Sequence, residues 1–254
     1  MQIVPLSAFS DNYIWAIVAQ GRCVVVDPGD ARPVEGFLKT QGLVLDAILI
    51  THHHGDHAGG IGALCSTSAV PVYGPAHEAI AGISHPVQGG DSLTLLDGAL
   101  PLSVLDVPGH TAGHIAYVTP GAVFCGDTLF SAGCGRLFEG SPAQMHQSLA
   151  TLAALPDDTA LYCAHEYTLA NLRFATAVEP GNPDIAAYTV QCQAQRAADT
   201  STLPSSIGLE KRVNPFLRCS TPAVRHAAEG FAEAPLPDTT AVFAALRRWK
   251  NEFR

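Results

Sequence analysis

The chain has 254 residues, of which 47% are hydrophobic and 15% are charged, a composition that predicts a globular protein with a sizeable core. Its 14 basic and 23 acidic residues give a net charge of −9, and no basic stripe is present that would favour nucleic-acid binding. No basic segment precedes an apolar stretch at the start, and no apolar run approaches the ~18–20 residues that span a bilayer. The seven cysteines form no Cys-x-x-Cys pair, which is typical of reduced cytosolic chains. We therefore expect a cytoplasmic monomer that binds neither nucleic acid nor membranes.

Up to about residue 165, short apolar segments alternate with Gly and Pro, which predicts strands mixed with helices in a layered α/β domain. Strands are expected at 13–18 and 23–26, paired as a hairpin, and then at 45–51, 70–73, 102–107, 122–125 and 161–164. Helices are expected at 33–41, 59–66 and 142–152.

After residue 165 the pattern becomes helical. A helix is expected at 169–178, and Asn182 can cap the next one, with Pro183 at its first position and a body at 185–198. A loop at 200–206 follows, and then a final helix at 239–253 with Asp238 or Thr239 as its cap. We therefore expect two domains, a catalytic domain at 1–165 and a helical substrate-binding domain at 166–254.

The segment Thr51-His52-His53-His54-Gly55-Asp56-His57 directly follows the expected strand at 45–51. In an extended chain, residues two apart point the same way, so His52 and His54 would project together while His53 points away. Gly55 would permit a tight reversal that brings the Asp56 and His57 side chains beside them. Imidazole and carboxylate groups are ligands for Zn²⁺, and iron and manganese accept the same donors. The spacing therefore predicts a metal site.

Three further donors each follow an expected buried strand: His110 after 102–107, Asp127 after 122–125 and His165 after 161–164. Folds of the α/β class place ligand sites beyond the carboxyl ends of their strands. We therefore expect two divalent metal ions, with Zn²⁺ as the first choice, bridged by Asp127. The remaining donors divide into two sets, His52, His54 and His110 for one ion and Asp56, His57 and His165 for the other.

Two cations at such a site would serve hydrolysis. A single bound Zn²⁺ already lowers the pKa of its water to about 7, so a water between two cations becomes a hydroxide nucleophile at neutral pH. The same ions polarise a carbonyl group and stabilise the oxyanion that forms after attack. The donor pattern therefore predicts hydrolysis of an acyl bond without a covalent enzyme intermediate.

The segment from Thr51 to His57 resembles the T-H-x-H-x-D-H signature of the metallo-β-lactamase superfamily. Further motifs, spread nearly from end to end of the chain, resemble those of glyoxalase II, the hydroxyacylglutathione hydrolases. These are Gly126-Asp127-Thr128-Leu129-Phe130, Ala132-Gly133-Cys134-Gly135-Arg136, Cys163-Ala164-His165-Glu166-Tyr167, Glu179-Pro180-Gly181-Asn182 and Asn214-Pro215-Phe216-Leu217-Arg218. The resemblance implies an α/β fold, a metallo-β-lactamase-like αββα sandwich with a small C-terminal α-helical domain.

The same resemblance implies hydrolysis of S-D-lactoylglutathione to D-lactate and glutathione by a metal-bridging hydroxide, the second step of methylglyoxal detoxification. The family's metal ligands fall without substitution on the seven donors named above, and Asp56 and Asp127 are the expected catalytic residues. Its glutathione-contacting positions fall on Arg136, Phe138, Tyr167, Arg247 and Lys250.

Two of these positions depart from the family pattern, because Arg136 stands where Lys is frequent and Phe138 where Tyr is frequent. Phe138 cannot donate the hydroxyl hydrogen bond of a tyrosine. Arg247 and Lys250 are three residues apart, so they would share one helix face and could hold the carboxylates of glutathione.

Three other interpretations stay open at this point. A mononuclear iron persulfide dioxygenase would share the fold, but its C-terminal region is shorter and different. A non-enzymatic metal-binding protein would not need an aspartate placed to bridge two ions. A β-lactamase interpretation is disfavoured because no export signal and no zinc-binding cysteine at the corresponding place are present.

Overall fold

The computed structural model describes residues 1–67 and 69–253. The chain forms two compact units. Unit 1 comprises Met1–Asp106 and Thr111–Gly126, and unit 2 comprises Val107–His110 and Asp127–Arg254.

A mixed sheet forms the first part of unit 1, with its strands in sequence order from β1 to β6. Strands β1 to β3 pair antiparallel, whereas β3 to β6 pair parallel. The strands are β1 (Gln2–Ala8), β2 (Asn12–Ala19), β3 (Arg22–Val26), β4 (Val44–Leu49), β5 (Val72–Pro75) and β6 (His85–Val87). Strand β3 is buried from Cys23 to Val26 and β4 from Ala47 to Leu49, and both are rich in Val, Ile and Leu, as expected where helices cover a parallel sheet.

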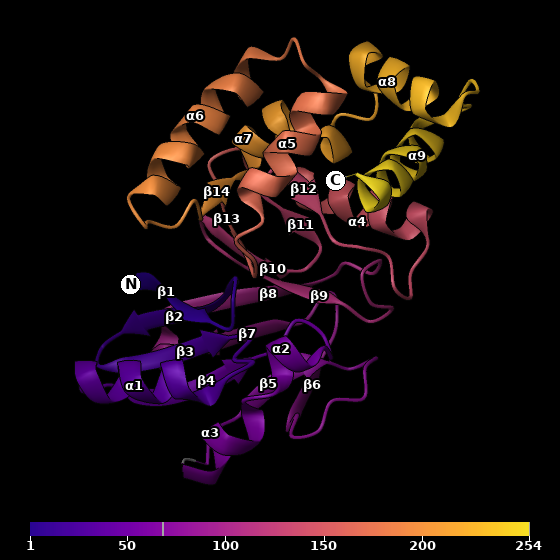
Figure 1. The fold of residues 1–254 in the computed structure, drawn as a ribbon. Helices are drawn as coiled ribbons and strands as arrows, with labels where there is room; N and C mark the ends of the chain where they lie inside the picture. Colours follow the sequence, from indigo (N-terminus) through magenta and orange to yellow (C-terminus); the bar gives the residue numbers. More distant parts are fainter. Residues whose placement is uncertain (68, 254) are drawn as a thin grey trace. The chain divides into compact units, whose positions relative to one another are not determined.

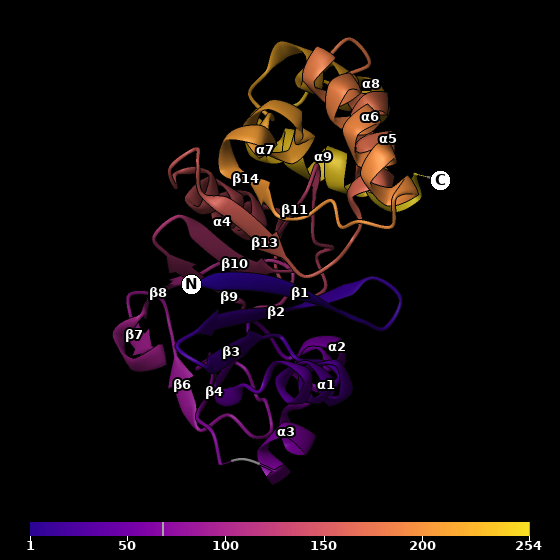
Figure 2. The same cartoon turned by 90° about the vertical axis from the view of Figure 1, so that its left-hand side faces the viewer.

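Helix α1 (Ala31–Gln41) is the crossover between the parallel strands β3 and β4. It begins where the Asp30 side chain accepts a hydrogen bond from the backbone N–H of Arg32. With α3 (Ile61–Thr67) it lies along one face of the sheet (Figures 1 and 2), and Val34 packs there against Ile48 and Leu64 in one apolar cluster. The short helix α2 (Gly55–Ala58) lies between β4 and α3 in the chain.

Four more strands of unit 1 form an antiparallel ladder in the order β10-β9-β8-β7. They are β7 (Ser92–Leu95), β8 (Leu100–Asp106), β9 (Ile115–Thr119) and β10 (Ala122–Gly126), with the 3₁₀ turn η1 (Leu96–Gly98) between β7 and β8. At the end of β10, Gly126 has a φ of 49°, and a Cβ there would lie 2.3 Å from the Thr51 hydroxyl oxygen. Only glycine permits this close approach to the segment that carries His52.

Unit 2 contains two small strand pairs and a group of helices. Its strands are β11 (Leu129–Phe130) with β12 (Gly133–Cys134) and β13 (Ala160–Cys163) with β14 (Ser205–Ser206), both antiparallel. Its helices are α4 (Pro142–Ala153), α5 (Thr168–Val178), α6 (Pro183–Ala197), α7 (Ile207–Val213), η2 (Pro215–Leu217), α8 (Pro222–Ala232) and α9 (Thr239–Glu252). Figure 2 shows α5 to α9 gathered as a helical region.

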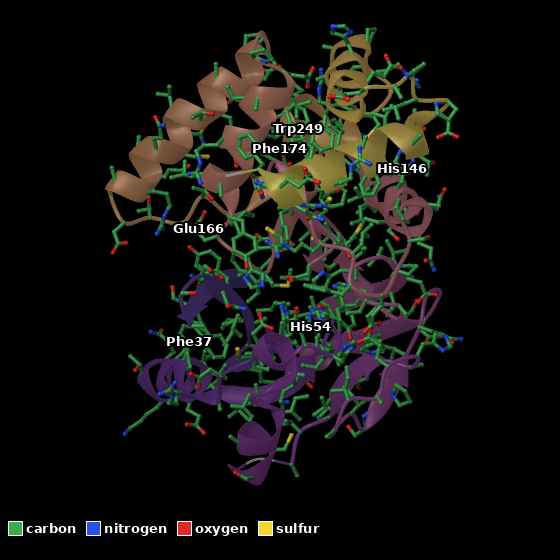
Figure 3. All side chains as sticks on the ribbon, turned by 45° about the vertical axis from the view of Figure 1, so that its right-hand side comes forward. Phe37, His54, His146, Glu166, Phe174 and Trp249 are labelled. Atoms are coloured by element: carbon green, nitrogen blue, oxygen red, sulfur yellow. The ribbon has the colours of Figure 1, made fainter. Side chains whose placement is uncertain are left out.

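Aromatic rings form much of the interior of this helical region. Phe174 of α5 and Trp249 of α9 (Figure 3) meet edge-on with ring centroids 5.3 Å apart. Phe174 also stacks on Phe216 at 5.9 Å. Phe216 in turn meets Phe243. Because such rings bury large apolar areas, they hold together helices that are distant in sequence.

The elements predicted from the sequence are largely confirmed. The hairpin of β2 and β3, helix α1 and the buried strands β4 and β10 form as expected. Asn182 caps α6 with Pro183 at its first position, and Asp238 caps α9. Three expectations need correction: the strand expected at 45–51 ends at Leu49, the helix expected at 59–66 begins only at Ile61, and the loop expected at 200–206 ends in strand β14.

Among the described residues, no helix combines the length and the apolarity that crossing a bilayer requires. The domain boundary expected at residue 165 stays a prediction.

Candidate metal centre

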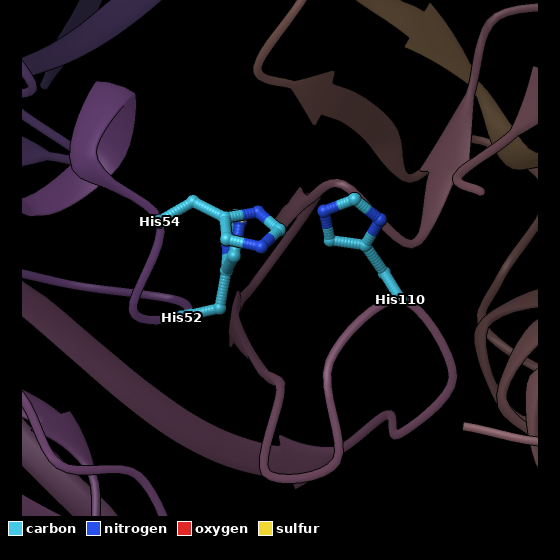
Figure 4. Close-up of side chains that lie close together, drawn as sticks. All are labelled: His52, His54 and His110. Atoms are coloured by element: carbon cyan, nitrogen blue, oxygen red, sulfur yellow. Dashed lines mark hydrogen bonds between the residues drawn. The ribbon is translucent and has the colours of Figure 1, made fainter. Parts of the chain in front are cut away.

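The predicted donors of unit 1 lie in the connection from β4 to α2. Strand β4 ends at Leu49, so His52 and His54 stand beyond it on a loop (Figure 4). They nevertheless turn toward each other, with His52 Nε2 3.1 Å from His54 Nδ1. Gly55 does not make a left-handed turn; it begins α2, and this helical turn places Asp56 and His57 beside one another.

A buried carboxylate that the sequence analysis missed orients this loop. Asp27, directly after β3, accepts hydrogen bonds from the Thr51 backbone N–H (2.8 Å) and the Thr51 hydroxyl (2.7 Å). Its Oδ2 also lies 3.0 Å from His57 Nδ1, and Thr51 Oγ1 lies 3.0 Å from His52 Nδ1. Each of these four side chains is at least 96% buried. One carboxylate therefore fixes two imidazole rings.

The hydrogen bonds also fix where the ring protons lie. A carboxylate oxygen can only accept, so His57 donates from Nδ1 to Asp27. The Thr51 hydroxyl donates its only proton to Asp27, so toward His52 it is the acceptor, and His52 donates from Nδ1. In their neutral forms both rings then carry a lone pair on Nε2, the arrangement that metal-binding histidines adopt.

Asp56 is the fourth predicted donor of unit 1. Its Oδ2 lies 3.5 Å from His57 Nε2 and accepts a hydrogen bond from the Asn12 amide at 3.0 Å. The Asn12 amide favours the charged form of this carboxylate. Asp56 therefore presents an anionic oxygen to the lone pair of His57 Nε2, and a cation between these two acceptors would make the contact favourable.

His53 points away from this group, as predicted. Its Nδ1 lies 3.0 Å from Oε2 of Glu78, a nearly buried carboxylate. The other oxygen of Glu78 accepts hydrogen bonds from the Thr111 hydroxyl and from the Gly113 N–H at 3.2 Å. Glu78, which the sequence analysis did not single out, therefore joins the donor loop to the segment that follows His110.

The predicted donors of unit 2 converge on Asp127, which directly follows β10. Its Oδ2 lies 3.4 Å from His110 Nε2, and its Oδ1 lies 3.3 Å from His165 Nε2. All three side chains are buried, and Figure 4 shows His110 on the loop after β8. The two oxygens of one carboxylate thus face two different imidazoles, which is the arrangement a bridging ligand requires.

His110 is oriented by backbone rather than by a carboxylate. Its Nδ1 lies 2.8 Å from the carbonyl oxygen of Arg136, which can only accept, so Nδ1 donates and Nε2 carries the lone pair in the neutral ring. That lone pair faces an oxygen of Asp127. As with Asp56 and His57, two acceptors face each other, and a bound cation would satisfy both. The donor chemistry of both units therefore fits divalent metal ions.

Two of the predicted substrate residues pack on metal donors of unit 2. Phe138 is 63% exposed and meets the His110 ring edge-on at 5.3 Å. Tyr167 is 37% exposed and stacks on the His165 ring at 4.7 Å with an interplanar angle of 6°. Arg136 is exposed. These side chains offer a surface beside the donors that a ligand could reach.

Arg247 and Lys250 share one face of α9, as predicted, but both are more buried than an exposed helix end would be. Arg247 Nη1 donates to the Cys134 carbonyl at 2.7 Å, and Lys250 Nζ donates to the Ala170 carbonyl at 3.0 Å. Burial, followed by the charges of Arg247 and Arg173, lowers the pKa of Lys250 to about 8. Arg173 is a further cation that the sequence analysis missed.

Two family models together match nearly the whole chain. Residues 9–165 match the metallo-β-lactamase superfamily, and residues 166–253 match the hydroxyacylglutathione hydrolase C-terminus. The hydroxyacylglutathione hydrolases of Nitrosomonas eutropha and Alkalilimnicola ehrlichii are 52% and 56% identical, over 100% and 99% of both chains. The chain belongs to the hydroxyacylglutathione hydrolase family.

Solved structures agree with this assignment at the level of the fold. ETHE1 from Myxococcus xanthus has a TM-score of 0.67 at 26% identity, with both chains covered completely. TTHA1623 in a di-iron-bound form has a TM-score of 0.60 at 26% identity, covering 85% of this chain and 100% of that one. The metallo-β-lactamase fold with a helical C-terminal region is therefore confirmed.

In this hydrolase, the residues that sequence reasoning missed are those that orient donors rather than bind metal. Asp27 stands in Val26-Asp27-Pro28-Gly29 at the carboxyl end of a buried strand, the same position that identified His110, Asp127 and His165. Its place after β3 could therefore have identified Asp27 from the sequence. Glu78 lies three residues beyond the carboxyl end of β5.

Proposed function

We propose that the chain hydrolyses S-D-lactoylglutathione to D-lactate and glutathione at a binuclear metal centre held by its seven predicted ligands. Water adds across the thioester: its oxygen bonds to the acyl carbon, the carbon–sulfur bond breaks, and glutathione leaves as the thiolate. Two bound divalent ions would supply an acidified water and a polarised carbonyl. Family membership at 52–56% identity over the whole chain is the observation that carries the reaction.

The seven ligands divide into two sets that share Asp127. We propose that His52, His54 and His110 would hold one ion and that Asp56, His57 and His165 would hold the other, with Asp127 as a ligand of both. The support for Asp127 as the bridge is that its two oxygens face different histidines. We assign Zn²⁺ first, because imidazole and carboxylate donors suit it, while iron or manganese would fit the same set.

Asp56 and Asp127 act in catalysis through charge. Both place anionic oxygens beside imidazole Nε2 atoms, so they would set the net charge around bound ions and hence the acidity of a water held there. The leaving thiolate belongs to a thiol whose pKa is about 8.5, so it departs without a general acid. Neither of these two catalytic roles requires a protonated side chain.

The substrate's peptide portion carries two carboxylates, and the cations of unit 2 suit them. We assign this binding to Arg136, Phe138, Tyr167, Arg247 and Lys250. Lys250 has Arg136, Arg173 and Arg247 as its cationic neighbours, a local concentration of positive charge in a chain of net charge −9. An anionic ligand would relieve this repulsion, which favours a dicarboxylate over a neutral ligand.

We further propose that the enzyme acts in the cytoplasm as a monomer, with the helical region at 166–254 binding the glutathione portion. The composition of the chain and its reduced cysteines support this placement.

The test is metal analysis combined with a thiol-release assay on S-D-lactoylglutathione. We expect two metal ions per chain and stoichiometric release of glutathione and D-lactate. A mononuclear dioxygenase would instead hold one iron and consume oxygen with glutathione persulfide. Oxygen consumption without thioester cleavage would contradict the proposal.

A further inference from the structure

The segment from Asp127 to Arg136, which contains β11 and β12, is here named the metal hairpin. Its first residue is the proposed bridging ligand, and the carbonyl of its last residue accepts the hydrogen bond that orients His110. The ends are held close together: the Gly135 N–H donates to the Thr128 carbonyl at 3.2 Å. A Cβ on Gly135 would lie 2.0 Å from the carbonyl oxygen of Asp127. A shift of this hairpin therefore moves both donors.

The tip of the metal hairpin, from Phe130 to Gly133, has a strained backbone. Ala132 has a φ of 54°, a left-handed conformation that costs a non-glycine residue about 1–3 kcal/mol. The tip also buries backbone groups that need partners, since Ser131, Ala132 and Gly133 are almost fully inaccessible. The strained tip therefore depends on groups from elsewhere in the chain.

Glu210 of α7 supplies the central partner. Its side chain is fully buried, and Oε2 accepts hydrogen bonds from the Ala132 N–H at 2.7 Å and the Asn214 amide at 3.0 Å. The Ser205 hydroxyl donates to Oε1. Burial raises the pKa of Glu210, and the hydrogen bonds from Ser205, Ala132 and Asn214 oppose that rise. A carboxylate this deeply buried is costly, so its three donors must be well placed.

Two asparagines complete the support. The Asn214 amide also lies within hydrogen-bonding distance of the Phe130 carbonyl (3.1 Å) and the Gly133 carbonyl (2.9 Å), and Asn171 of α5 donates to the Ser131 carbonyl at 3.0 Å. Asn214 and Asn171 are both buried. Consecutive residues of the hairpin tip are thus bonded to side chains of the helical region.

We propose that Glu210, with Asn214 and Asn171, is a positioning residue that sets the geometry of the metal donors Asp127 and His110 through the metal hairpin. The helical C-terminal region then serves the metal centre as well as the substrate. This inference rests on the metal centre of the proposed function, but not on the identity of the thioester.

The test compares two replacements of Glu210. In Glu210→Gln, the amide oxygen can replace Oε2 as acceptor, and the amide N–H groups can donate to the Ser205 oxygen. In Glu210→Leu, the shape is similar, but the Ala132 N–H and the Asn214 amide lose their acceptor. Val224→Ala on α8, a buried position of the same unit, is the control for a loss of stability alone.

The readout is Zn²⁺ affinity of the full-length chain, measured by competition with a chromophoric chelator at a temperature where circular dichroism shows each variant folded. We expect Glu210→Leu to weaken the affinity about 10- to 100-fold, as for residues that orient metal ligands elsewhere. Glu210→Gln should keep it within about threefold of the wild type, and Val224→Ala should leave it unchanged.

Wild-type affinity in folded Glu210→Leu would overturn the inference, as would an equal loss in Val224→Ala. If Glu210→Leu does not fold, Asn171→Ala is the second test, because it removes the hydrogen bond to the Ser131 carbonyl. We then expect a smaller but measurable loss of Zn²⁺ affinity. An unchanged affinity would overturn the inference. A wild type that binds two ions but does not cleave S-D-lactoylglutathione would refute the proposed function and leave this test intact.

Discussion

The two units orient their metal donors by different means. In unit 1 a single buried carboxylate, Asp27, holds Thr51 and His57 directly and His52 through the Thr51 hydroxyl. In unit 2 the group that orients His110 is a backbone carbonyl, at the end of a hairpin whose strained tip is bonded to buried side chains of the helical region. Unit 1 therefore relies on one charged hydrogen-bond centre, and unit 2 relies on the position of a backbone segment.

This difference indicates which changes would disturb the donors of each unit. Removing Asp27 would free two imidazoles at once and would also take away the acceptor of the Thr51 backbone N–H. In unit 2, His110 depends on the position of a backbone carbonyl, so a disturbance of the hairpin spreads to this donor. Asp127 stands apart from both patterns, because it faces two histidines itself.

The largest expected effect is that of Asp127→Ala. Because this change removes the proposed ligand of both ions, we expect turnover of S-D-lactoylglutathione to fall by at least about 10³-fold, together with a loss of bound metal. The measurements are the thiol-release rate and metal content by mass spectrometry. Asp157→Ala removes a 73% exposed carboxylate from the same unit and is the charge-matched control. Retained turnover at full metal content would refute the bridging role.

Asp27→Ala tests the carboxylate of unit 1. We expect metal affinity to fall about 10- to 100-fold, since two imidazoles lose the group that fixes their ring protons. Chelator competition measures this affinity. Asp27→Asn removes the charge and keeps the shape of the side chain. Its single amide oxygen can accept a hydrogen bond from Thr51, but it cannot accept from both Thr51 and His57 as the carboxylate does. An affinity unchanged in both variants would show that the ring orientations do not depend on Asp27.

A pH dependence is expected from the cation group of unit 2. The pKa of Lys250 is lowered to about 8 by burial first and then by Arg247 and Arg173, so Lys250 loses its charge as the pH rises through about 8. Binding of an anionic ligand should therefore weaken above that pH. The dissociation constant of glutathione, measured from pH 6.5 to 9.5, should rise in the wild type.

Lys250→Arg is the matched variant, since arginine stays charged throughout this range. Its dissociation constant should rise less than that of the wild type over this range, because only the titration of glutathione itself is left. Identical profiles for both proteins would exclude Lys250 as the source of the pH dependence.

The smallest expected effect is that of Phe138→Tyr. Phe138 is exposed and contacts the His110 ring, so a hydroxyl added there stays in solvent and can donate to the substrate. One such hydrogen bond contributes about 0.5–1.5 kcal/mol, which corresponds to a KM lower by about 2- to 10-fold with kcat unchanged. Steady-state kinetics on S-D-lactoylglutathione measure both constants. A change in kcat alone would place residue 138 beside the reacting atoms instead.

The sequence predicted what is local. The seven donors could be predicted because four lie in one short motif and the other three each follow a buried apolar strand. The caps Asn182 and Asp238 could be predicted from their residue type and their place before a helix. His52 and His54 do lie close together, as predicted. They do not extend a strand, however, because β4 ends before them.

What could not be predicted depends on distant pairs. Glu78 reaches Thr111 across 33 residues, and Glu210 reaches Ala132 across 78. Nothing local distinguishes a carboxylate that orients a loop from one that faces water, because only the fold decides which donors surround it. The burial of Arg247 against the Cys134 carbonyl was hidden for the same reason, since a basic helix end ordinarily lies in solvent.

The central claim is that seven donors hold two metal ions on which hydrolysis depends. Stepwise addition of Zn²⁺ to the metal-free chain, with thiol release from S-D-lactoylglutathione followed at each step, tests it most directly. We expect activity to saturate at two equivalents per chain. Full turnover without metal, or saturation at a single equivalent, would contradict it.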